Sequence, residues 1–268
     1  FQPEKYVLNT AKFSITDNKL LDDDAELTDK YGETNTDPYV DGTSNNEAEN
    51  INTKSVKRGE KIYYQVWLDT TKFDAANKDN IQSVGISDDY DEAKLDLDST
   101  KIKAYDSVTG ADVTDKFDIT VNNGVITATL KAGFTKSLGD AENTQVIDTT
   151  KFAFGRYYKF DIPATVKESV KAGADIENTA NQTIHQYNPF NKKVTTPEKP
   201  TQTRENNVPV PLEFNYTKRL EGRELTAGEF SFVLKDKDNK VLQTVTNDKD
   251  GHIKFEKLLF NKDDLGKT

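Results

Sequence analysis

The sequence contains neither cysteine nor methionine, and it has only two histidines. Without cysteine no disulfide can stabilise these domains, and a zinc site made from His185 and His252 alone is improbable. Because no residue is methionine, the chain lacks its own start residue. We therefore expect it to be a fragment of a longer protein, so missing targeting signals mean little.

Long apolar runs and an excess of basic residues are also missing. No apolar stretch approaches the length of a membrane span. The net charge of -10 argues against nucleic-acid binding, which needs clustered Lys and Arg. An acidic chain suits a self-repelling surface protein or a binder of divalent cations, although the acid could simply keep the protein soluble.

Motifs of turnover enzymes are absent as well. The sequence shows no nucleophile elbow, no phosphate-binding loop and no dinucleotide fingerprint. Paired acids occur by chance in so acidic a chain, so a glycosidase has little support. We expect a protein that is not a turnover enzyme.

The chain does contain many aromatic residues, 11 Tyr and 14 Phe, which is enough for β-sandwich cores. The densest run is KIYYQVWLD at 61–69, which holds the single tryptophan, Trp67. Its residues alternate with a period of two, which predicts a strand buried on at least one face. The apolar run ends at an acid, Asp69.

Several other segments show strand-like alternation. FDITV and VITATL flank the turn residues 122–124, Asn-Asn-Gly, and predict a hairpin over 117–130. Short helical pieces are expected only within 132–150 and 167–173. Together the short strands predict an all-β, immunoglobulin-like sandwich. The other expected strands lie around 7, 13–15, 81–86, 94–106, 156–166 and 175–186.

Composition divides the chain into three parts. Residues 1–191 form the sandwich domain, and 192–211 are rich in Pro, Thr and charge, which indicates a stiff linker. Residues 212–268 start a second β module with strands expected at 212–218, 229–235, 240–246 and 252–255. This module is short for a sandwich, so we expect it to be cut off at its C-terminal side.

Four segments in order resemble the C-terminal domains of the antigen I/II family of Gram-positive surface adhesins. They are PEKYV near the start, KRGEKIYYQVWLD at 57–69, SDDYD at 87–91 and IENTA at 176–180. The segment YTKRLEGRELTAGEFSFVLKD is similar to the first half of a streptococcal pilin isopeptide-linkage, T-antigen-like domain. The resemblance implies DEv-type sandwiches, cell-wall attachment and self-formed lysine–asparagine isopeptide bonds.

Such a bond needs a buried lysine, an acid and an asparagine in one core. The family pattern implies Asn178 as the amide, Asp69 as the promoting acid and Lys5 as the amine. Lys12 is the alternative amine. Each residue could instead be structural: a strand lysine is usually solvated, and Asp69 before two threonines could cap a turn.

In the second module Lys218 is the matching lysine. Its acid and asparagine partners in the pilin pattern are expected beyond Thr268, because neither Glu221 nor Asn247 stands in the expected place. We therefore expect no completed bond within the second module as given.

The motif SDDYD places Asp88, Asp89 and Asp91 in one short turn. Oxygen ligands at such spacing suit Ca²⁺, and residues 21–50 offer further carboxylates. EF-hand spacing is absent, so a solvated acidic turn is the competing interpretation.

These expectations lead to an extracellular, cell-wall-anchored adhesin stalk module, with its anchor outside the sequence given. It would be monomeric, catalyse one turnover on itself, support adhesion or aggregation, and project a head toward host or bacterial ligands. The first alternative is a glycan-binding sandwich without a crosslink. The second is a module that grips a host protein through the acidic residues 21–50.

Overall fold

The computed structural model describes residues 1–9, 51–73, 80–139, 145–188 and 190–260, together with 264 and 266. Within these residues the regular structure consists of β-strands and short 3-10 turns, without an α-helix. The predicted all-β fold is confirmed. Two compact units divide the chain: one comprises 1–170 and 175–206, and the other 171–174 and 207–268.

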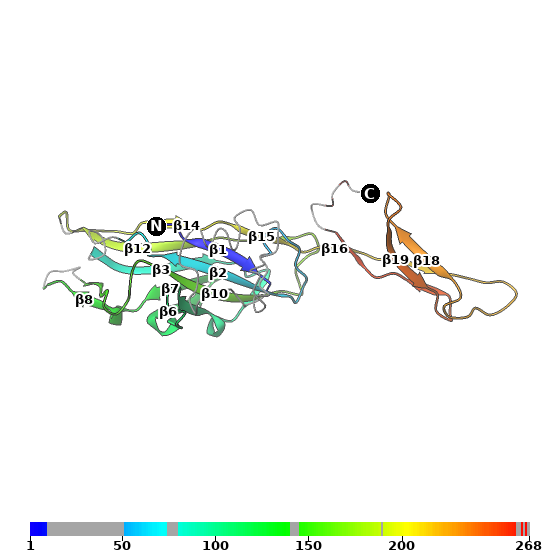
Figure 1. Ribbon diagram of the computed structural model, residues 1–268, viewed down its shortest axis with the longest axis horizontal. Helices are drawn as coiled ribbons and strands as arrows, with labels where there is room; N and C mark the ends of the chain where they lie inside the picture. The colour runs from blue at the N-terminus through cyan, green and yellow to red at the C-terminus, as the bar shows by residue number, and fades with distance from the viewer. Residues whose placement is uncertain are drawn as a thin grey trace. The chain divides into compact units, whose positions relative to one another are not determined.

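The first sheet of the larger unit is built around the predicted central strand. β2 lies between β1 and β10 in antiparallel pairing, and β4 and β5 pair with the far edge of β10 (Figure 1). Eight of the nine residues of β2 are at least half-buried, which agrees with the apolar and aromatic run. The bounds are β1 Glu4–Leu8, β2 Lys61–Asp69, β4 Leu95–Leu97, β5 Lys103–Asp106 and β10 Tyr157–Val166.

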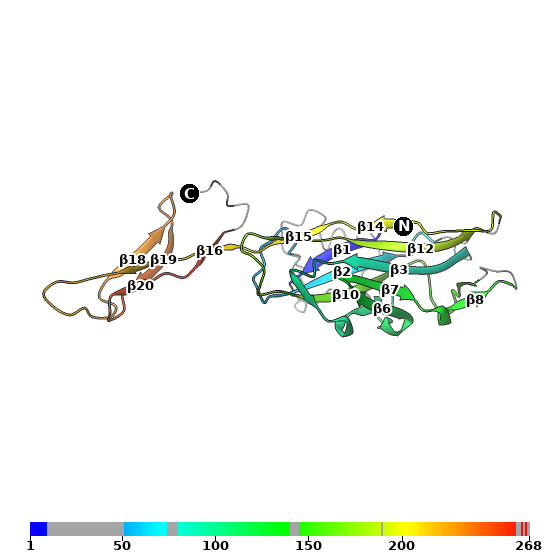
Figure 2. The same ribbon diagram turned by 180° about the vertical axis from the view of Figure 1, so that it is seen from behind.

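The second sheet has the order β13-β12-β3-β7-β6, and β14 also pairs with β12 (Figure 2). The hairpin expected over 117–130 is present as β6 and β7. Asn123 and Gly124 both have positive φ, which a two-residue hairpin turn of type I′ requires. The bounds are β3 Ile81–Asp89, β6 Phe117–Asn122, β7 Val125–Leu130, β12 Ala180–Asn188, β13 Lys193–Thr195 and β14 Glu198–Pro200.

Aromatic side chains join the two sheets into a sandwich. Phe117 of β6 meets Phe160 of β10 edge-to-face, with ring centroids 4.9 Å apart. Phe152 stacks on Tyr158 at 4.3 Å and is fully buried. Each buried ring of this kind contributes about 1.5–3 kcal/mol through removal of apolar area from water.

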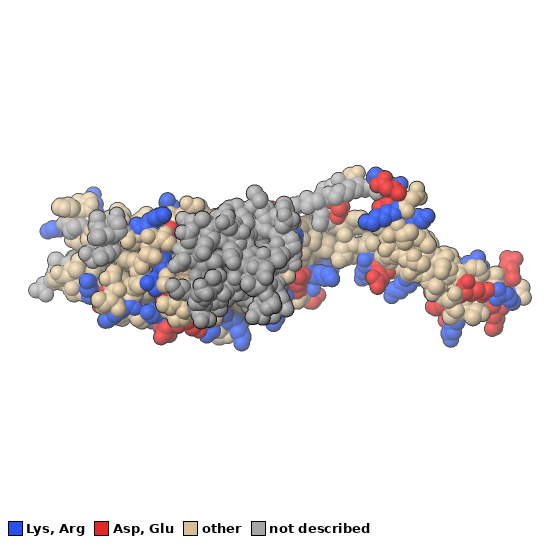
Figure 3. All heavy atoms as spheres, viewed as in Figure 1, with Lys and Arg blue, Asp and Glu red and all other residues tan. Residues whose placement is uncertain are grey.

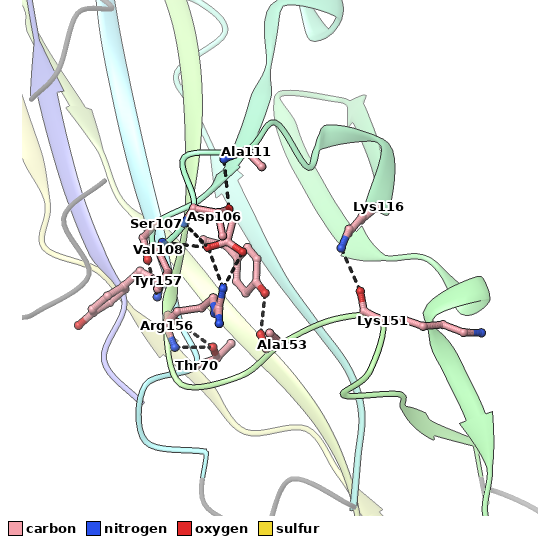
Figure 4. A network of polar contacts seen from close by, with 12 residues as sticks. Thr70, Asp106, Ser107, Val108, Ala111, Lys116, Lys151, Ala153, Arg156 and Tyr157 are labelled. Atoms are coloured by element: carbon pink, nitrogen blue, oxygen red, sulfur yellow. Dashed lines mark hydrogen bonds and ion pairs between the residues drawn. The ribbon is translucent and has the colours of Figure 1, made fainter. Parts of the chain in front are cut away.

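An ion pair holds the turn that follows β5. Arg156 donates from Nη1 to both carboxylate oxygens of Asp106, at 3.1 and 2.8 Å (Figure 4). Asp106 also accepts the backbone N–H groups of Val108 and Thr109. The same arginine exchanges hydrogen bonds with Thr70, so the ends of β2, β5 and β10 are fastened together.

The structure differs from the predicted linker over 192–211. β14 pairs with β12, and β15, Arg204–Asn207, pairs with β11, Asp175–Asn178. The side chains of Thr201, Arg204 and Asn206 are buried. The first unit therefore extends to Asn206 rather than 191, because these polar side chains hydrogen-bond to sheet edges instead of to water.

Two expected helical pieces are also corrected. Within 132–150 the described residues, 132–139 and 145–150, contain a 3-10 turn at Ala132–Phe134 followed by β8, Thr135–Ser137, and β9, Gln145–Ile147. Residues 167–173 form hydrogen-bonded turns. Where the structure describes the chain, it contains no helix long enough and apolar enough to cross a membrane.

The second unit consists of three two-stranded antiparallel pairs: β16 with β21, β17 with β20 and β18 with β19. Several of its large apolar side chains are more than two-fifths exposed, including Tyr216, Val233 and Val241. On the face shown in Figure 3, Lys and Arg side chains lie among Asp and Glu side chains wherever the residues are described. The bounds are β16 Val210–Leu212, β17 Asn215–Thr217, β18 Ser231–Lys235, β19 Val241–Thr246, β20 His252–Lys254 and β21 Leu258–Phe260.

Candidate crosslinking site in the first sandwich

A lysine lies in the core between the two sheets. Lys5 is opposite Val66 in the β1–β2 pairing, so its side chain shares the inward face of the sheet with Val66 and Tyr64. The side chain is completely buried, and its Nζ lies 4.9 Å from the centre of the Tyr64 ring. A buried ammonium is costly without a partner, so its surroundings determine its chemistry.

That partner is Asp88 of β3. Lys5 Nζ donates to Asp88 Oδ2 at 2.6 Å, and both side chains have zero exposed area. Asp88 continues the inward face that Val84 and Ile86 begin, since residues two apart on a strand point the same way. The other carboxylate oxygen, Oδ1, is buried and has no hydrogen-bond partner among the described residues.

The predicted amide lies in the same core. Asn178 ends β11, in which Ile176 and Asn178 are buried and Asp175 and Glu177 are exposed. It is two residues before Ala180, which pairs with Asp88 across β12 and β3. The amide is also close enough to Tyr64 to act on the pKa of that phenol.

The Asn178 amide is unusual because it is buried without a hydrogen bond of ordinary geometry to any described residue. Its side chain is 2% exposed, and neither Nδ2 nor Oδ1 has a hydrogen-bond partner in the part of the chain that the structure describes. A buried amide normally finds partners, and leaving it unpaired costs about 1–3 kcal/mol. An unpaired buried group of this kind calls for an explanation beyond packing.

Burial sets the proton affinities in this cluster. It lowers the pKa of Lys5 from 10.5, and the charge of Asp88 opposes that change. Burial also raises the pKa of Tyr64, with Asp88 acting in the same direction. A lysine with a lowered pKa gives up its proton more readily, and Asp88 lies within proton-transfer distance. The cluster therefore favours a neutral amine at Lys5.

The structure does not bring Asp69 into this cluster. In β2 it lies on the face of Trp67, opposite to the face of Val66 and Lys5. Its Oδ1 accepts both the N–H and the hydroxyl of Thr71, and its Oδ2 accepts the N–H of Gln2. Asp69 therefore caps a turn, and the position expected for it is occupied by Asp88. The alternative amine, Lys12, lies outside the described residues.

The three acids of SDDYD do not converge on one point. Asp88 is directed into the core, and its neighbour Asp89 is exposed. Asp91 is ion-paired with Lys94 at 2.8 Å and accepts the N–H of Ala93. The structure does not gather these three carboxylates, because the successive strand residues Asp88 and Asp89 point to opposite faces and Asp91 lies beyond the end of β3; calcium binding there stays a prediction. The acidic residues 21–50 lie outside the described part of the chain.

Among the described residues, one group has ligand atoms close enough to share an ion: Asp248, Asp250 and His252, within 4.8 Å of one another. All three are exposed. Asp248 Oδ1 accepts the N–H groups of Asp250 and His252, and Oδ2 lies 3.0 Å from His252 Nδ1. These hydrogen bonds of a tight turn account for the clustering.

In the second unit the Lys218 ammonium lies 4.9 Å from the centre of the Phe230 ring. It forms no ion pair with a described residue. Asn247 is buried, but its amide is satisfied by the carbonyls of Thr226 and Asp248 and by the N–H of Phe230. Asn247 therefore holds the 226–230 loop in place through these hydrogen bonds. The crosslink partner of Lys218 stays a prediction.

The role of Asp88 was missed in the sequence, although a signal for it exists. Val84, Ile86 and Asp88 alternate in one strand, which extends an apolar face into an acid. A second buried lysine, Lys159, was also missed. It lies on the opposite face of the first sheet, across from Trp67, 2.9 Å from Asp161 and over the Tyr105 ring.

One curated relative matches much of this chain. Aggregation substance of Enterococcus faecalis (strain ATCC 700802 / V583) is 26% identical over 199 residues, which is 68% of this chain and 13% of that protein. The chain thus spans about an eighth of the length of this relative.

Similar solved structures include a pilin subunit and a domain of an AgI/II polypeptide. The major pilin subunit BcpA of Bacillus cereus has a TM-score of 0.44 at 21% identity, covering 77% of this chain and 52% of that chain. The C-terminal domain of the AgI/II polypeptide BspA of Streptococcus agalactiae has a TM-score of 0.42 at 15% identity, covering 77% and 50%.

The family model described as "Cell surface antigen I/II C2 terminal domain" matches residues 40–197. This range includes β2, Asp88 and Asn178, and it ends before β14. Since the match covers more than half of the 268 residues, the chain belongs to the antigen I/II family of cell-surface proteins.

Proposed function

We propose that the larger unit is a stalk module of a Gram-positive surface adhesin, stiffened by an isopeptide bond between Lys5 and Asn178. Asp88 is the promoting acid. The bond forms once per molecule, so the chain acts on itself and turns over no substrate. In this role the chain is extracellular, is anchored to the cell wall, and holds an adhesive head toward host or bacterial ligands.

The reaction begins with a proton transfer. Asp88 takes a proton from the Lys5 ammonium across their 2.6 Å contact, which leaves a neutral amine and a neutral acid. Lys5 Nζ attacks Cγ of Asn178, while the protonated Asp88 donates a hydrogen bond to the amide oxygen. The amine proton passes through Asp88 to the departing nitrogen. One C–N bond forms, one breaks, and ammonia leaves.

One observation carries this proposal: a fully buried lysine and acid share a core with a buried asparagine whose amide has no hydrogen-bond partner among the described residues. Packing alone gives no reason to bury these three groups together, since each is costly to remove from water. As reactants of an amide-forming step they would gain from burial, because a dry core that holds an amine and an amide close together promotes their reaction.

The bond would join β1 to the end of β11 and so close most of the first unit into a loop. Loop-closure entropy for so long a loop is worth about 5 kcal/mol, by analogy with a disulfide. Under tension the load would pass from Lys5 directly to Asn178, and the strands between them would not be pulled apart. A cysteine-free surface protein gains covalent stiffness in this way.

Intact mass spectrometry of the purified chain tests the proposal. We expect a mass lower than the sequence mass by one ammonia, and the full sequence mass in Asn178→Ala. Lys5→Arg keeps the charge beside Asp88 but cannot react in the same way, and should also keep the full mass. Lys12→Arg is the matched control and should lose ammonia as the parent does. Full mass in the parent would refute the proposal.

A further inference from the structure

The backbone of Lys5 is held by side chains from a segment that follows the family-matched region. β1 is an edge strand, and the N–H and C=O of Lys5 point away from β2, as they do in a non-hydrogen-bonded antiparallel pair. The N–H donates to Gln202 Oε1 at 3.0 Å, and the C=O accepts a hydrogen bond from Arg204 Nε. Two side chains therefore take hydrogen bonds of Lys5 for which the described residues offer no neighbouring strand.

The same two side chains also contact Glu4 and Tyr6, the residues on either side of Lys5. Gln202 Nε2 donates to the carboxylate of Glu4. The guanidinium of Arg204 lies over the Tyr6 ring, 5.3 Å from its centre, and the arginine is only 2% exposed. Three consecutive residues of β1 are thus fixed by one short segment.

We name 201–206 the seating segment, and it is itself fastened near the asparagine. Thr201 donates its N–H to the carbonyl of Ala180 at 2.8 Å, and its hydroxyl oxygen accepts the N–H of Ala180 at 3.1 Å. Ala180 lies opposite Asp88 and two residues after Asn178. The seating segment therefore connects the strand that carries the lysine with the strand that follows the asparagine.

Further contacts anchor the other end of the seating segment. The backbone of Glu205 exchanges hydrogen bonds with Asn52 and Thr53, at 2.9 and 2.7 Å. The Asn206 amide donates to the carbonyls of Ile51 and Lys54. A segment fixed at both ends can hold Lys5 at one position along β1.

We propose that Gln202 and Arg204 are positioning residues for the crosslink: they set the location of Lys5 so that its amine reaches Asn178. This rests on the proposed isopeptide bond. Their hydrogen bonds to Lys5 are made to its backbone, so both act through its position. Because the seating segment follows Asn178 in the chain, the amine is placed only once the whole first unit has been made.

The positive charge of Arg204 also favours the neutral, reactive amine of Lys5. The cationic Arg204 lowers the pKa of Lys5, in addition to the larger effect of burial. Replacing Arg204 with a neutral residue should therefore move the pH profile of bond formation to higher pH. A residue that only stabilised the fold would leave the pH profile where it is.

The experiment follows ammonia loss over time by intact mass during cell-free synthesis of the full chain. Arg204→Met, which keeps the apolar stem but not the donor or the charge, should slow the reaction by roughly tenfold to a hundredfold and shift its pH profile upward. Gln202→Ala, a milder change, should slow it less, and Arg204→Lys should recover part of the rate. Arg156→Met, in the Asp106 ion pair, is the matched control.

The outcomes separate the two proposals. If the parent chain never loses ammonia, the isopeptide bond itself is refuted. If the parent loses ammonia and Arg204→Met and Gln202→Ala react at the parental rate, only the positioning role is refuted. The same holds if Arg204→Met and Arg156→Met slow the reaction equally and leave its pH profile unchanged.

Discussion

Asp69 and Asp88 are both buried carboxylates, but their hydrogen bonds give them different tasks. Among the described residues, the Asp88 carboxylate accepts a hydrogen bond from the Lys5 ammonium alone, while both oxygens of Asp69 accept hydrogen bonds around a turn. We predict that Asp88→Asn abolishes the loss of ammonia because no acid remains to move protons. Asp69→Asn should keep the bond and lower the free energy of unfolding by about 1 kcal/mol, the usual effect of a lost cap.

Intact mass and urea denaturation check this pair of variants. Removing one partner of a buried ion pair destabilises by about 3–5 kcal/mol, so folding of Asp88→Asn should be verified by circular dichroism. Lys5→Met/Asp88→Leu removes both charges and gives a folded reference without the bond. Full mass in Asp69→Asn together with ammonia loss in Asp88→Asn would restore Asp69 as the acid.

A pH dependence is expected from the second buried lysine. Burial lowers the pKa of Lys159 from 10.5 to about 8, and the charge of Asp161 opposes this. Below about pH 8 the Lys159 amine is protonated in both the folded and the unfolded state, and the folded state is destabilised by the buried ammonium. Between about 8 and 10.5 the unfolded state binds more protons, so stability rises with pH. The expected gain by pH 10 is on the order of 2 kcal/mol.

Urea denaturation at pH 7.5 and pH 10 measures this gain. Lys159→Met removes the titrating group, so its stability should lack the rise seen in the parent chain. Equal pH slopes in the two proteins would show that Lys159 keeps an ordinary pKa.

At the scale of elements, the contact of β3 with β7 leaves no room for a side chain at Gly85. A Cβ there would lie 2.5 Å from the carbonyl oxygen of Ala128, a backbone atom that cannot step aside. Gly85→Ala should therefore destabilise by about 1–3 kcal/mol. Gly133→Ala is the control, because a Cβ at Gly133 meets nothing within 4 Å. Thermal unfolding should give a lower melting temperature for Gly85→Ala than for Gly133→Ala. Equal melting temperatures would contradict the prediction.

Elements with a strong period were predictable, and elements fixed by tertiary contacts were not. The central strand over 61–69 and the hairpin over 117–130 follow from alternation and from the Asn-Gly turn. A short helix was expected within 132–150, but the described residues there form a 3-10 turn and two short strands. The sequence of this segment has no strong helical or strand period, so it did not show which would form. The linker prediction over 192–211 failed from 193 to 206, where the chain pairs with or covers sheet edges of the first unit, because polar composition does not show which edge a segment will cover.

The site was predictable in part for the same reason. Lys5 and Asn178 were identified through a family likeness, and both lie buried in one core. Asp88 was assigned to a metal because three acids cluster in SDDYD. Its true direction depends on strand pairing, which moves a residue from surface to core with a shift of one position. Adjacent acids in a sequence therefore need not share a face.

At the scale of the whole molecule, the proposed bond changes how the larger unit resists unfolding. The bond joins the first strand to the end of β11, so the unfolded chain would remain a closed loop. We predict that Asn178→Ala lowers the free energy of unfolding by about 5 kcal/mol, a large share of the 5–15 kcal/mol of a typical domain. Calorimetry or denaturant titration measures this, and a change below about 1 kcal/mol would contradict it.

Peptide mapping by tandem mass spectrometry tests the central claim most directly. After proteolysis of the folded chain, we predict one branched peptide in which the Lys5 side chain is joined to the Asn178 side chain with the loss of one ammonia. A bond from another lysine, such as Lys12, would contradict the assignment of Lys5. Recovery of linear peptides with intact Lys5 and Asn178 would contradict the crosslink altogether.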